Sequence, residues 1–349
     1  MQSSYSTNDV TLLLKDITGM VTPLETKQRE ALIQKGTHYC EMLPLEYRPS
    51  PKYIEAYNIS LESYANPTAN AVCQVSEKIY RLKGKSTVIV SLARAGIPIG
   101  ILIKHYLDKK YNLCVPHYSI SIIRERGIDT NAIDYILERH TPTDIQFVDG
   151  WIGKGAIQNE LRETLKAYPQ INSDLAVLAD PANITDLCGT HEDILIPSSC
   201  LNSTVSGLIS RTFLRDDIIS PSDFHGAAFY PQFSNEDVSY EFINAIEKHF
   251  DFSAIAQDIP RGVLGITEVE NIASNFGINN INFVKPGIGE ATRVLLRRVP
   301  WKLLIAQKCQ NDPLLTHLLH LAAEKNVPTE VYPLHSYKAC GIIKNMADI

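Results

Sequence analysis

Several features that mark special classes of protein are missing from this sequence. No apolar run reaches membrane-spanning length, and the N-terminal residues show no basic start followed by an apolar stretch, which argues against a secretory leader. The 7 cysteines are odd in number, scattered and without a CxxC pair, which argues against a disulfide framework and a structural zinc site. We therefore expect reduced thiols, a cytoplasmic location and no membrane partner.

An excess of positive charge is also absent. The formal net charge of -6 argues against a general affinity for nucleic acid, so a nucleic-acid role would need a local basic surface. Internal repeats and low-complexity tracts are missing too, and 349 residues are enough for two or three domains, each with its own core. The sequence leaves the oligomeric state open, with a homodimer as one option.

What the sequence does contain is an alternation of strand-like and helix-like segments. A strand-like run at 86–92 and an alternating strand pattern at 117–123 flank a helical pattern at 98–107. Such alternation predicts an α/β fold with a largely parallel sheet covered by helices on both faces. The pattern becomes less regular after residue 173, and a proline and glycine pair near 257–262 marks a boundary. We predict an N-terminal extension at 1–60, a parallel-sheet core at 61–172, a middle α+β unit completing the active site at 173–256, and a small α/β/α sandwich at 262–345.

Some local patterns predict single elements. The residues from Thr22 to Glu25 resemble a capping box with proline in the first helical turn, which predicts a helix start there. A helical pattern covers 70–82, and the apolar runs at 193–197 and 281–284 predict two further strands.

The most informative segment is FVDGWIGKGA, a buried strand that ends in an acid and turns through glycines into a helix. The free N–H groups of such a turn and the dipole of the helix favour a bound phosphate. Asp149 stands at the carboxyl end of its strand, where open α/β sheets contact ligands, and could accept hydrogen bonds from two ribose hydroxyls. An ordinary turn explains the same residues equally well. The loop residues expected to hold the phosphorylated ligand are Gly150, Gly153, Lys154, Gly155 and Ala156.

A second strand end, SLARAGIPIG, also leads through small residues into a helix. Ala95 and Gly96 allow a ligand to approach the backbone closely, and Arg94 offers a planar fork for a dianion. Taken alone, the motif is explained by a plain strand-to-helix turn. Together with the polar loop at 124–127, the two strand ends match a ligand that carries a phosphate and a pyrophosphate.

These segments resemble the type I phosphoribosyltransferases, in which FVDGWIGKGA corresponds to the ribose-phosphate loop, SLARAGIPIG to the pyrophosphate loop and RERG to the mobile covering loop. More closely, the chain is similar to a bacterial family found with tellurite-resistance and stress operons. In that family a phosphoribosyltransferase domain precedes a pelota-like RNA-binding domain, and some members are called StiP cysteine proteases. The similarity is also carried by ISIIRERGID, LIPSSCLNSTVSGLISRT, DFHGAAFY, KPGIGEATRVLLRRVP and VYPLHSYKACGIIK.

The resemblance implies a phosphoribosyltransferase that uses phosphoribosyl pyrophosphate with magnesium and ribosylates a base or nucleoside-like acceptor in a stress-response pathway. Arg94, with Arg124 and Arg126 of the covering loop, would stabilise the leaving pyrophosphate, and Asp149 would bind the ribose and the metal. Gly150 stands where many members of the wider superfamily carry a second acid, which would weaken ribose and metal binding. The alternative that this departure favours is a non-catalytic sensor of the same donor.

A cysteine peptidase is the other alternative. Cys200 would be the nucleophile and His225 the base, with Asp223 or Asn202 orienting the imidazole. A small buried cysteine and a hydrogen-bonded turn histidine explain the same two residues without catalysis. In a third interpretation the acceptor pocket is lined by Cys200, His225, Ser203 and Thr204.

Two further patterns carry less information. Cys188 and His191 have the spacing of two metal ligands, but no further pair accompanies them, which favours a structural role. The segment KPGIGE opens a helix, and the pelota-like domains that it resembles bind kinked RNA through such a loop and helix start. The RNA contacts implied by this resemblance are Lys285, Gly287, Gly289 and Arg293, although a solvated helix face explains the arginine as well.

Overall fold

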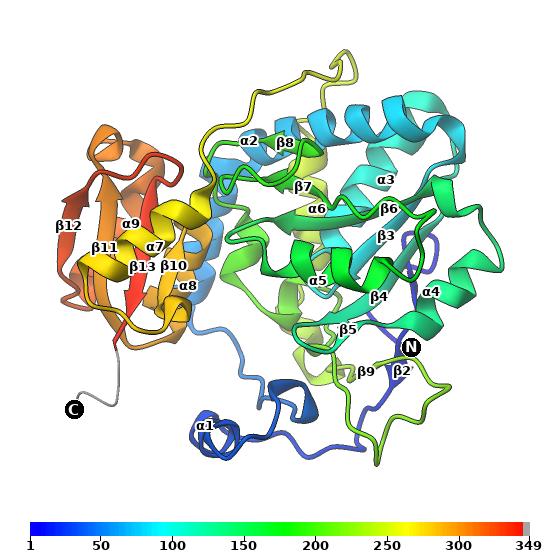
Figure 1. Ribbon diagram of the computed structural model, residues 1–349, viewed down its shortest axis with the longest axis horizontal. Coiled ribbons are helices and arrows are strands. Elements are labelled where there is room, and N and C mark those ends of the chain that lie inside the picture. Colours follow the sequence, from blue (N-terminus) through cyan, green and yellow to red (C-terminus); the bar gives the residue numbers. More distant parts are fainter. Residues whose placement is uncertain (345–349) are drawn as a thin grey trace.

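The computed structural model describes residues 1–344, without the side chains of Thr26, Glu30, Gln34 and Arg297. The last residue of the expected C-terminal domain, 345, lies outside this range. The chain forms a large α/β body around a 7-stranded sheet and a smaller body around a 4-stranded sheet (Figure 1). No helix within the described part of the chain is long and apolar enough to cross a membrane.

The central sheet confirms the expected α/β class. Its strands lie in the order β1-β4-β3-β6-β7-β8 and all run parallel, while the short β5 pairs antiparallel with β4. The carboxyl ends of β3, β4 and β6 therefore share one edge of the sheet. The strands are β1 (Thr11–Leu12), β3 (Val88–Ala93), β4 (His117–Ile123), β5 (Gly127–Ile128), β6 (Ile145–Trp151), β7 (Ala176–Ala179) and β8 (Cys188–Thr190).

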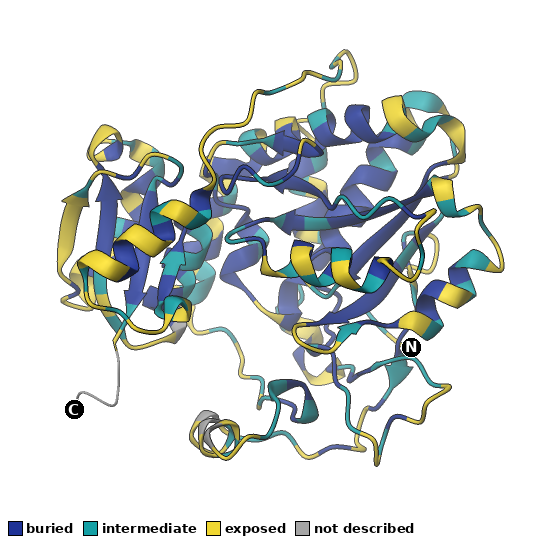
Figure 2. Ribbon diagram, in the orientation of Figure 1, coloured by how far each residue is buried: buried dark blue, intermediate teal, exposed yellow. Residues whose placement is uncertain are grey.

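Helices cover both faces of this sheet, which explains why its strands are apolar on both sides. One hydrophobic cluster packs one face against α2 (Pro51–Lys83), α3 (Ile97–Tyr111) and α6 (Ser239–Glu247). A second cluster packs the opposite face against α4 (Thr130–Leu137) and α5 (Ala156–Leu165). Figure 2 shows the strands as a buried layer between helices whose outer faces are exposed.

The N-terminal region is built into this body. β1 adds to the sheet beside β4, and β2 (Lys15–Asp16) pairs in parallel with β9 (Gly226–Ala227). Helix α2 spans 33 residues, far more than the expected 70–82, so the expected boundary at residue 60 falls inside it. Pro67 lies within this helix. Together with several polar residues, it interrupts the helical spacing of apolar residues in the sequence.

Two local predictions near the N-terminus and in the middle unit are corrected. Helix α1 (Thr26–Gln34) starts after Glu25, whose amide donates to the side chain of Gln28, so the cap is one turn later than expected. The run at 193–197 forms no strand, because Asp193 is drawn into contacts with the C-terminal domain and a 3₁₀ helix, Pro197–Cys200, follows. β7 and β8 continue the central sheet past residue 173.

The C-terminal body is a mixed sheet in the order β10-β13-β11-β12. A strand was expected at 281–284, but a 3₁₀ helix, Ile281–Phe283, precedes the strand there, and β13 was not anticipated. Helix α8 packs on β13 and on α9. The elements are α7 (Gly265–Asn275), β10 (Val284–Pro286), α8 (Ile288–Arg297), β11 (Pro300–Ala306), α9 (Thr316–Glu324), β12 (Thr329–Tyr332) and β13 (Ala339–Ile343).

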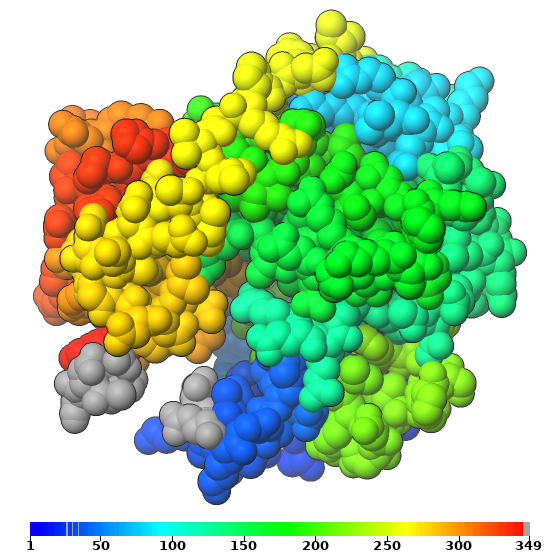
Figure 3. All heavy atoms as spheres, viewed as in Figure 1, coloured from blue at the N-terminus to red at the C-terminus, as the bar shows by residue number. Residues whose placement is uncertain are grey.

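An exposed segment joins the two bodies. It leaves α6, runs past α2 and enters α7 (Figure 1), and two ion pairs, Arg81 with Asp258 and Arg261 with Asp186, hold it to the larger body. The space-filling view shows a hollow where the C-terminal body, the N-terminal segment and the central body meet (Figure 3). The loop after β4 contacts the N-terminal segment, and the loop after β6 contacts the C-terminal body.

Candidate functional site

Arg94, at the end of β3, is held by protein groups. Its Nη1 donates to the carbonyl of Ile209 at 2.7 Å and lies 3.9 Å from the carboxylate of Glu46. Glu46 in turn accepts hydrogen bonds from the amide and hydroxyl of Ser203, at 3.3 and 3.2 Å. The structure thus brings the expected residues Arg94 and Ser203 together through Glu46, which the sequence did not indicate. Thr204 is buried next to Ser203.

The small residues after Arg94 have a structural explanation. A Cβ at Gly96 would lie 2.7 Å from the carbonyl oxygen of Leu92 and 2.9 Å from that of Val148. Glycine is therefore required by the close approach of β3, the following turn and β6, whatever the site binds. Ala95 is exposed in the same turn.

The glycine-rich loop after β6 contacts the C-terminal body. Lys154 Nζ donates to the carbonyls of Ile281 and Val284 at 3.0 and 3.2 Å, and the hydroxyl of Tyr337 donates to the carbonyl of Gly153 at 2.7 Å. Gly155 has a φ of 87°, which favours glycine, and precedes Ala156 at the start of α5. The predicted phosphate-binding loop thus forms part of the contact between the two bodies.

Asp149 is half-buried at the end of β6, on this edge of the sheet. Its Oδ1 accepts a hydrogen bond from the amide of Gly150 at 2.7 Å. Burial raises the pKa of Asp149 to about 7, although the Gly150 amide and the charge of Arg293 act in the opposite direction. Within residues 1–344, no three histidine, cysteine, aspartate or glutamate side chains are arranged to hold a metal ion. The magnesium prediction depends on the transferase interpretation.

The structure does not bring Cys200 and His225 into contact. The sulfur of Cys200 is buried and lies 3.6 Å from the hydroxyl of Ser60 on α2. His225 Nδ1 lies 2.9 Å from the hydroxyl of Ser121 on β4, and its amide donates to Asp129 at 2.6 Å. Asp223, a suggested orienting group, instead pairs with Lys15 at 2.6 Å. The catalytic role of Cys200 and His225 stays a prediction.

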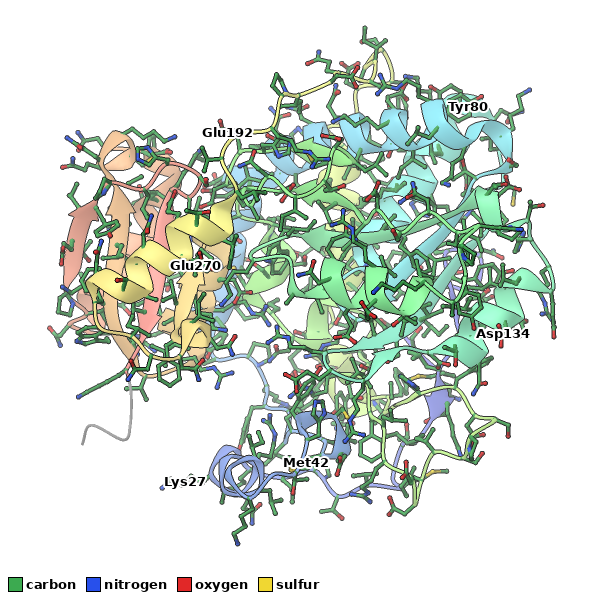
Figure 4. All side chains as sticks on the ribbon, viewed as in Figure 1. Lys27, Met42, Tyr80, Asp134, Glu192 and Glu270 are labelled. Atoms are coloured by element: carbon green, nitrogen blue, oxygen red, sulfur yellow. The ribbon has the colours of Figure 1, made fainter. Side chains whose placement is uncertain are left out.

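A different cysteine contacts an imidazole directly. The 3₁₀ helix Tyr39–Glu41 is capped by His38, whose Nδ1 accepts from the amide of Cys40 at 3.4 Å and lies 2.9 Å from its sulfur. The sequence signal for this pair is a histidine two residues before a cysteine, within the region predicted to be an N-terminal extension. The sequence did not indicate these two residues as a site. Met42, which follows this helix, marks its place below the sheet in Figure 4.

Cations surround this thiol and imidazole. The amide of Arg124 donates to the hydroxyl of Tyr39 at 2.9 Å, and the Arg211 guanidinium carbon lies 4.7 Å from the centre of the Tyr39 ring. Arg126 pairs with Glu41 at 3.1 Å. Burial raises the pKa of the Cys40 thiol, whereas the charges of Arg126 and Arg211 lower it. The expected covering-loop residues Arg124 and Arg126 thus lie beside Cys40.

A third cysteine is also near a histidine. The sulfur of Cys188 lies 3.7 Å from Nδ1 and 3.6 Å from Nε2 of His191. Because the two distances are almost equal, the sulfur does not lie in line with the lone pair of either nitrogen. His191 Nδ1 lies 2.9 Å from the carbonyl of Asp180 and 3.7 Å from its carboxylate. Burial raises the pKa of the Cys188 thiol to about 12, which makes it a poor nucleophile at neutral pH.

The loop that begins α8 faces the central body. The amide of Ile288 donates to both oxygens of the buried Asp193 carboxylate at 3.0 and 3.1 Å, and the amide of Gly287 donates to the carbonyl of Ala339 at 2.8 Å. A Cβ at Gly289 would lie 3.5 Å from the hydroxyl of Ser199. The backbone expected to meet RNA is therefore covered in this arrangement, and Lys285 and Arg293 are left at its rim.

Comparison with known proteins covers both bodies. Residues 3–247 match the family described as tellurite-like stress resistance cysteine protease StiP, and residues 263–345 match the PELOTA RNA binding domain. Over an alignment of 370 residues the chain is 34% identical to the "Cysteine protease StiP" of Acinetobacter baylyi, with 98% of this chain and 94% of that relative covered.

These matches correct the main functional prediction. The resemblance to the StiP family and to pelota-like domains is confirmed, whereas the phosphoribosyltransferase assignment is not supported. A glycosyltransferase was therefore the wrong class of enzyme, and its phosphoribosyl pyrophosphate donor and ribosyl acceptor find no support. Glycine-rich turns at strand ends suggested that chemistry, but here their contacts are with the protein itself.

Proposed function

Because the chain belongs to the StiP family of tellurite-like stress resistance cysteine proteases, we propose that it is a cysteine peptidase whose reactive thiol lies at the carboxyl edge of the central sheet. Open α/β sheets place their ligand contacts at this edge. A thiol peptidase needs a sulfur that can lose its proton, a base within reach and groups that stabilise negative charge.

The contact between Cys40 and His38 supports placing the nucleophile at Cys40. The sulfur lies 2.9 Å from His38 Nδ1, which is within reach of a proton transfer. That nitrogen also accepts the Cys40 amide at the longer distance of 3.4 Å, so the thiol and the amide share its one lone pair. Burial leaves the pKa of the Cys40 thiol above its ordinary value, and the charges of Arg126 and Arg211 offset part of that rise.

The reaction would follow the general thiol pathway. His38 accepts the thiol proton as the Cys40 sulfur bonds to the carbonyl carbon of a peptide. The carbon–nitrogen bond then breaks, the leaving amine takes the proton from the imidazolium, and a thioester remains. Water, deprotonated by His38, hydrolyses the thioester and restores the thiol. The cations beside Cys40 are suited to stabilise the oxyanion that forms in each half-reaction.

Cys200 with His225 is the competing placement. Burial lowers the pKa of His225, and the charge of Asp129, which accepts the His225 backbone amide, offsets part of that effect. Catalysis there requires a movement that brings the imidazole to the sulfur. Both cysteines are buried, but Cys40 has an imidazole in contact with its sulfur, whereas Cys200 lies in a hydrophobic cluster.

Thiol replacement tests these placements. The protein is treated with an alkyne-tagged iodoacetamide probe, the labelled cysteine is mapped by mass spectrometry, and hydrolysis of a fluorogenic peptide library is measured. We expect Cys40→Ser to abolish hydrolysis, and His38→Ala to slow it at least about 100-fold. Cys188→Ser should have little effect.

Loss of activity in Cys200→Ser, with Cys40→Ser active, would move the nucleophile to Cys200 and leave the peptidase assignment standing. Absence of hydrolysis by the wild type, or hydrolysis that survives replacement of all seven cysteines, would overturn the cysteine peptidase assignment. Circular dichroism of each variant separates loss of chemistry from loss of fold.

We also propose that the C-terminal body binds RNA, on the strength of its match to the PELOTA RNA binding domain. The predicted contacts Lys285 and Arg293 suit phosphate groups. Affinity for a labelled RNA hairpin should fall steeply as salt rises, because bound phosphates release counterions. Absence of binding at low salt would contradict this part of the proposal.

A further inference from the structure

The covered loop at the start of α8 raises the question of what RNA would contact in the intact chain. The first amide of the helix is bound to the carboxylate of Asp193, which belongs to the central body. That carboxylate also accepts the amide of Lys338 at 2.8 Å. An acidic group thus already occupies the place where a helix start would bind a phosphate.

Cations from both bodies gather around the covered loop. Lys285 and Arg293 belong to the C-terminal body, whereas Lys154 and Arg124 belong to loops of the central body. Arg124 is exposed, and the Arg293 side chain is 40% exposed. Lys154 bridges the two bodies through the carbonyls of Ile281 and Val284.

The charges of this group act on one another. Burial lowers the pKa of Lys285, and the charges of Arg124 and Arg293 lower it further. Burial also lowers the pKa of Lys154 to about 8, with Lys285 and Arg124 adding to the effect. Glu290 of the C-terminal body pairs with Arg293 at 3.1 Å, and its charge acts against the lowering of the Lys285 pKa. In a chain with a net charge of -6, such a gathering of cations suits a polyanion.

We propose that the RNA-binding surface of this chain spans the junction of its two bodies, with Lys285, Arg293 and Arg124 contacting successive phosphates of one RNA strand. The inference rests on the proposed RNA binding and deepens it, because it assigns part of the surface to the central body. Long cationic side chains reach phosphates while the loop backbone stays bound to Asp193. Bound RNA would also lie next to Tyr39 and the thiol of Cys40, since the amide of Arg124 is bonded to Tyr39.

The test measures RNA affinity of the full chain over a range of salt concentrations, by fluorescence anisotropy with a labelled hairpin that carries a bulge. Arg124→Ala and Lys285→Ala are each expected to weaken binding several-fold and to reduce the slope of log affinity against log salt by about one. Arg124→Lys should keep the slope, because it keeps the charge. The matched control is Arg139→Ala, which removes a partly exposed arginine at the end of α4, on the far side of the central body.

The outcomes separate the inference from the proposal beneath it. If the wild-type chain binds no RNA at low salt, the proposed RNA binding fails. If Lys285→Ala weakens binding but Arg124→Ala behaves like Arg139→Ala, RNA binding stands and the shared surface is overturned. Tighter binding by Asp193→Asn without any effect of Arg124→Ala would also overturn it, because RNA would then use the freed loop backbone.

Discussion

At the scale of single residues, buried carboxyl groups distinguish this protein. Burial raises the pKa of Asp149 to about 7 and the pKa values of Asp180 and Asp193 to about 6. All three accept hydrogen bonds from backbone amides, and those bonds act against the effect of burial. Each lies at the carboxyl edge of the sheet or where the two bodies meet.

Asp149→Asn tests the effect of this burial on stability. The ordinary pKa of an aspartate is about 4, so between about pH 4 and 7 the folded chain keeps a proton that the unfolded chain has released. The wild type therefore loses stability as pH rises through this window. Asparagine does not titrate and keeps an oxygen for the Gly150 amide. We expect the variant to gain stability relative to wild type from about pH 4 to 7, by at most about 1.4 kcal/mol per unit of pKa shift.

Urea unfolding of both proteins at several pH values measures the difference. Glu138→Gln, at an exposed position on α4, serves as the control for loss of a carboxylate. Parallel stability curves for the wild type and Asp149→Asn would contradict a raised pKa at Asp149.

At the scale of elements, the packing of α2 on β8 depends on one glycine. A Cβ at Gly189 would lie 2.3 Å from the carbonyl oxygen of Ala71 and 2.6 Å from its Cα. These are backbone atoms of a long buried helix, so no side chain can turn away to make room. The helix and the edge strand of the sheet approach each other because position 189 carries no side chain.

Gly189→Ala is therefore expected to destabilise the protein by about 1–3 kcal/mol, as overpacking in a core does. Gly153→Ala is the matched control, because an added Cβ there meets no atom within 4 Å. Thermal and urea unfolding of both variants provide the comparison. Equal stability of Gly189→Ala and Gly153→Ala would show that α2 can shift at little cost.

At the scale of the whole molecule, the C-terminal body packs on the central body through a shared hydrophobic cluster and a set of polar contacts. The carboxylate of Asp193 accepts hydrogen bonds from two amides of the C-terminal body. Lys154 donates to two carbonyls of that body, and the hydroxyl of Tyr337 donates to the carbonyl of Gly153 in the central body. The connecting segment before α7 is exposed (Figure 2). Apolar packing and these directed bonds together set the relative position of the two bodies.

Asp193→Ala should loosen this junction. The change leaves the buried amide of Ile288 and that of Lys338 without their acceptor, at a cost of about 1–3 kcal/mol for each group. We expect faster tryptic cleavage at Arg261 in the connecting segment and a larger radius of gyration in solution. Asp174→Ala, which removes a half-exposed carboxylate paired with Arg162, is the control. Cleavage at the wild-type rate would show that other contacts dominate.

The sequence predicted elements well where the physical signal is local. The strand His117–Ile123 is predicted at its observed bounds, because the alternation of side chains along a strand is visible in the sequence. β8 and β13 escaped notice because they are short and contain small residues. Helix α2 was cut short because Pro67 and polar side chains interrupt its period, and only its neighbours stabilise it across that proline.

The candidate site was predictable only in part. The sequence indicated Arg94, Asp149 and the loop at 124–127 as residues of one sheet edge, and the fold places them there. It did not indicate Cys40, because nothing local says that residues before α2 fold back to meet Arg124.

By itself, the sequence determined the α/β class, the parallel sheet and the relationship to a StiP family with a pelota-like domain, since periodicity and motifs are local in the chain. Only the tertiary structure decided what the glycine-rich strand ends do. Their amides and cations meet carbonyls and carboxylates that are distant in sequence. Which thiol lies beside the loop at 124–127 was likewise decided by the fold, because Tyr39 and Glu41 meet Arg124 and Arg126 only when segments far apart in the sequence pack together.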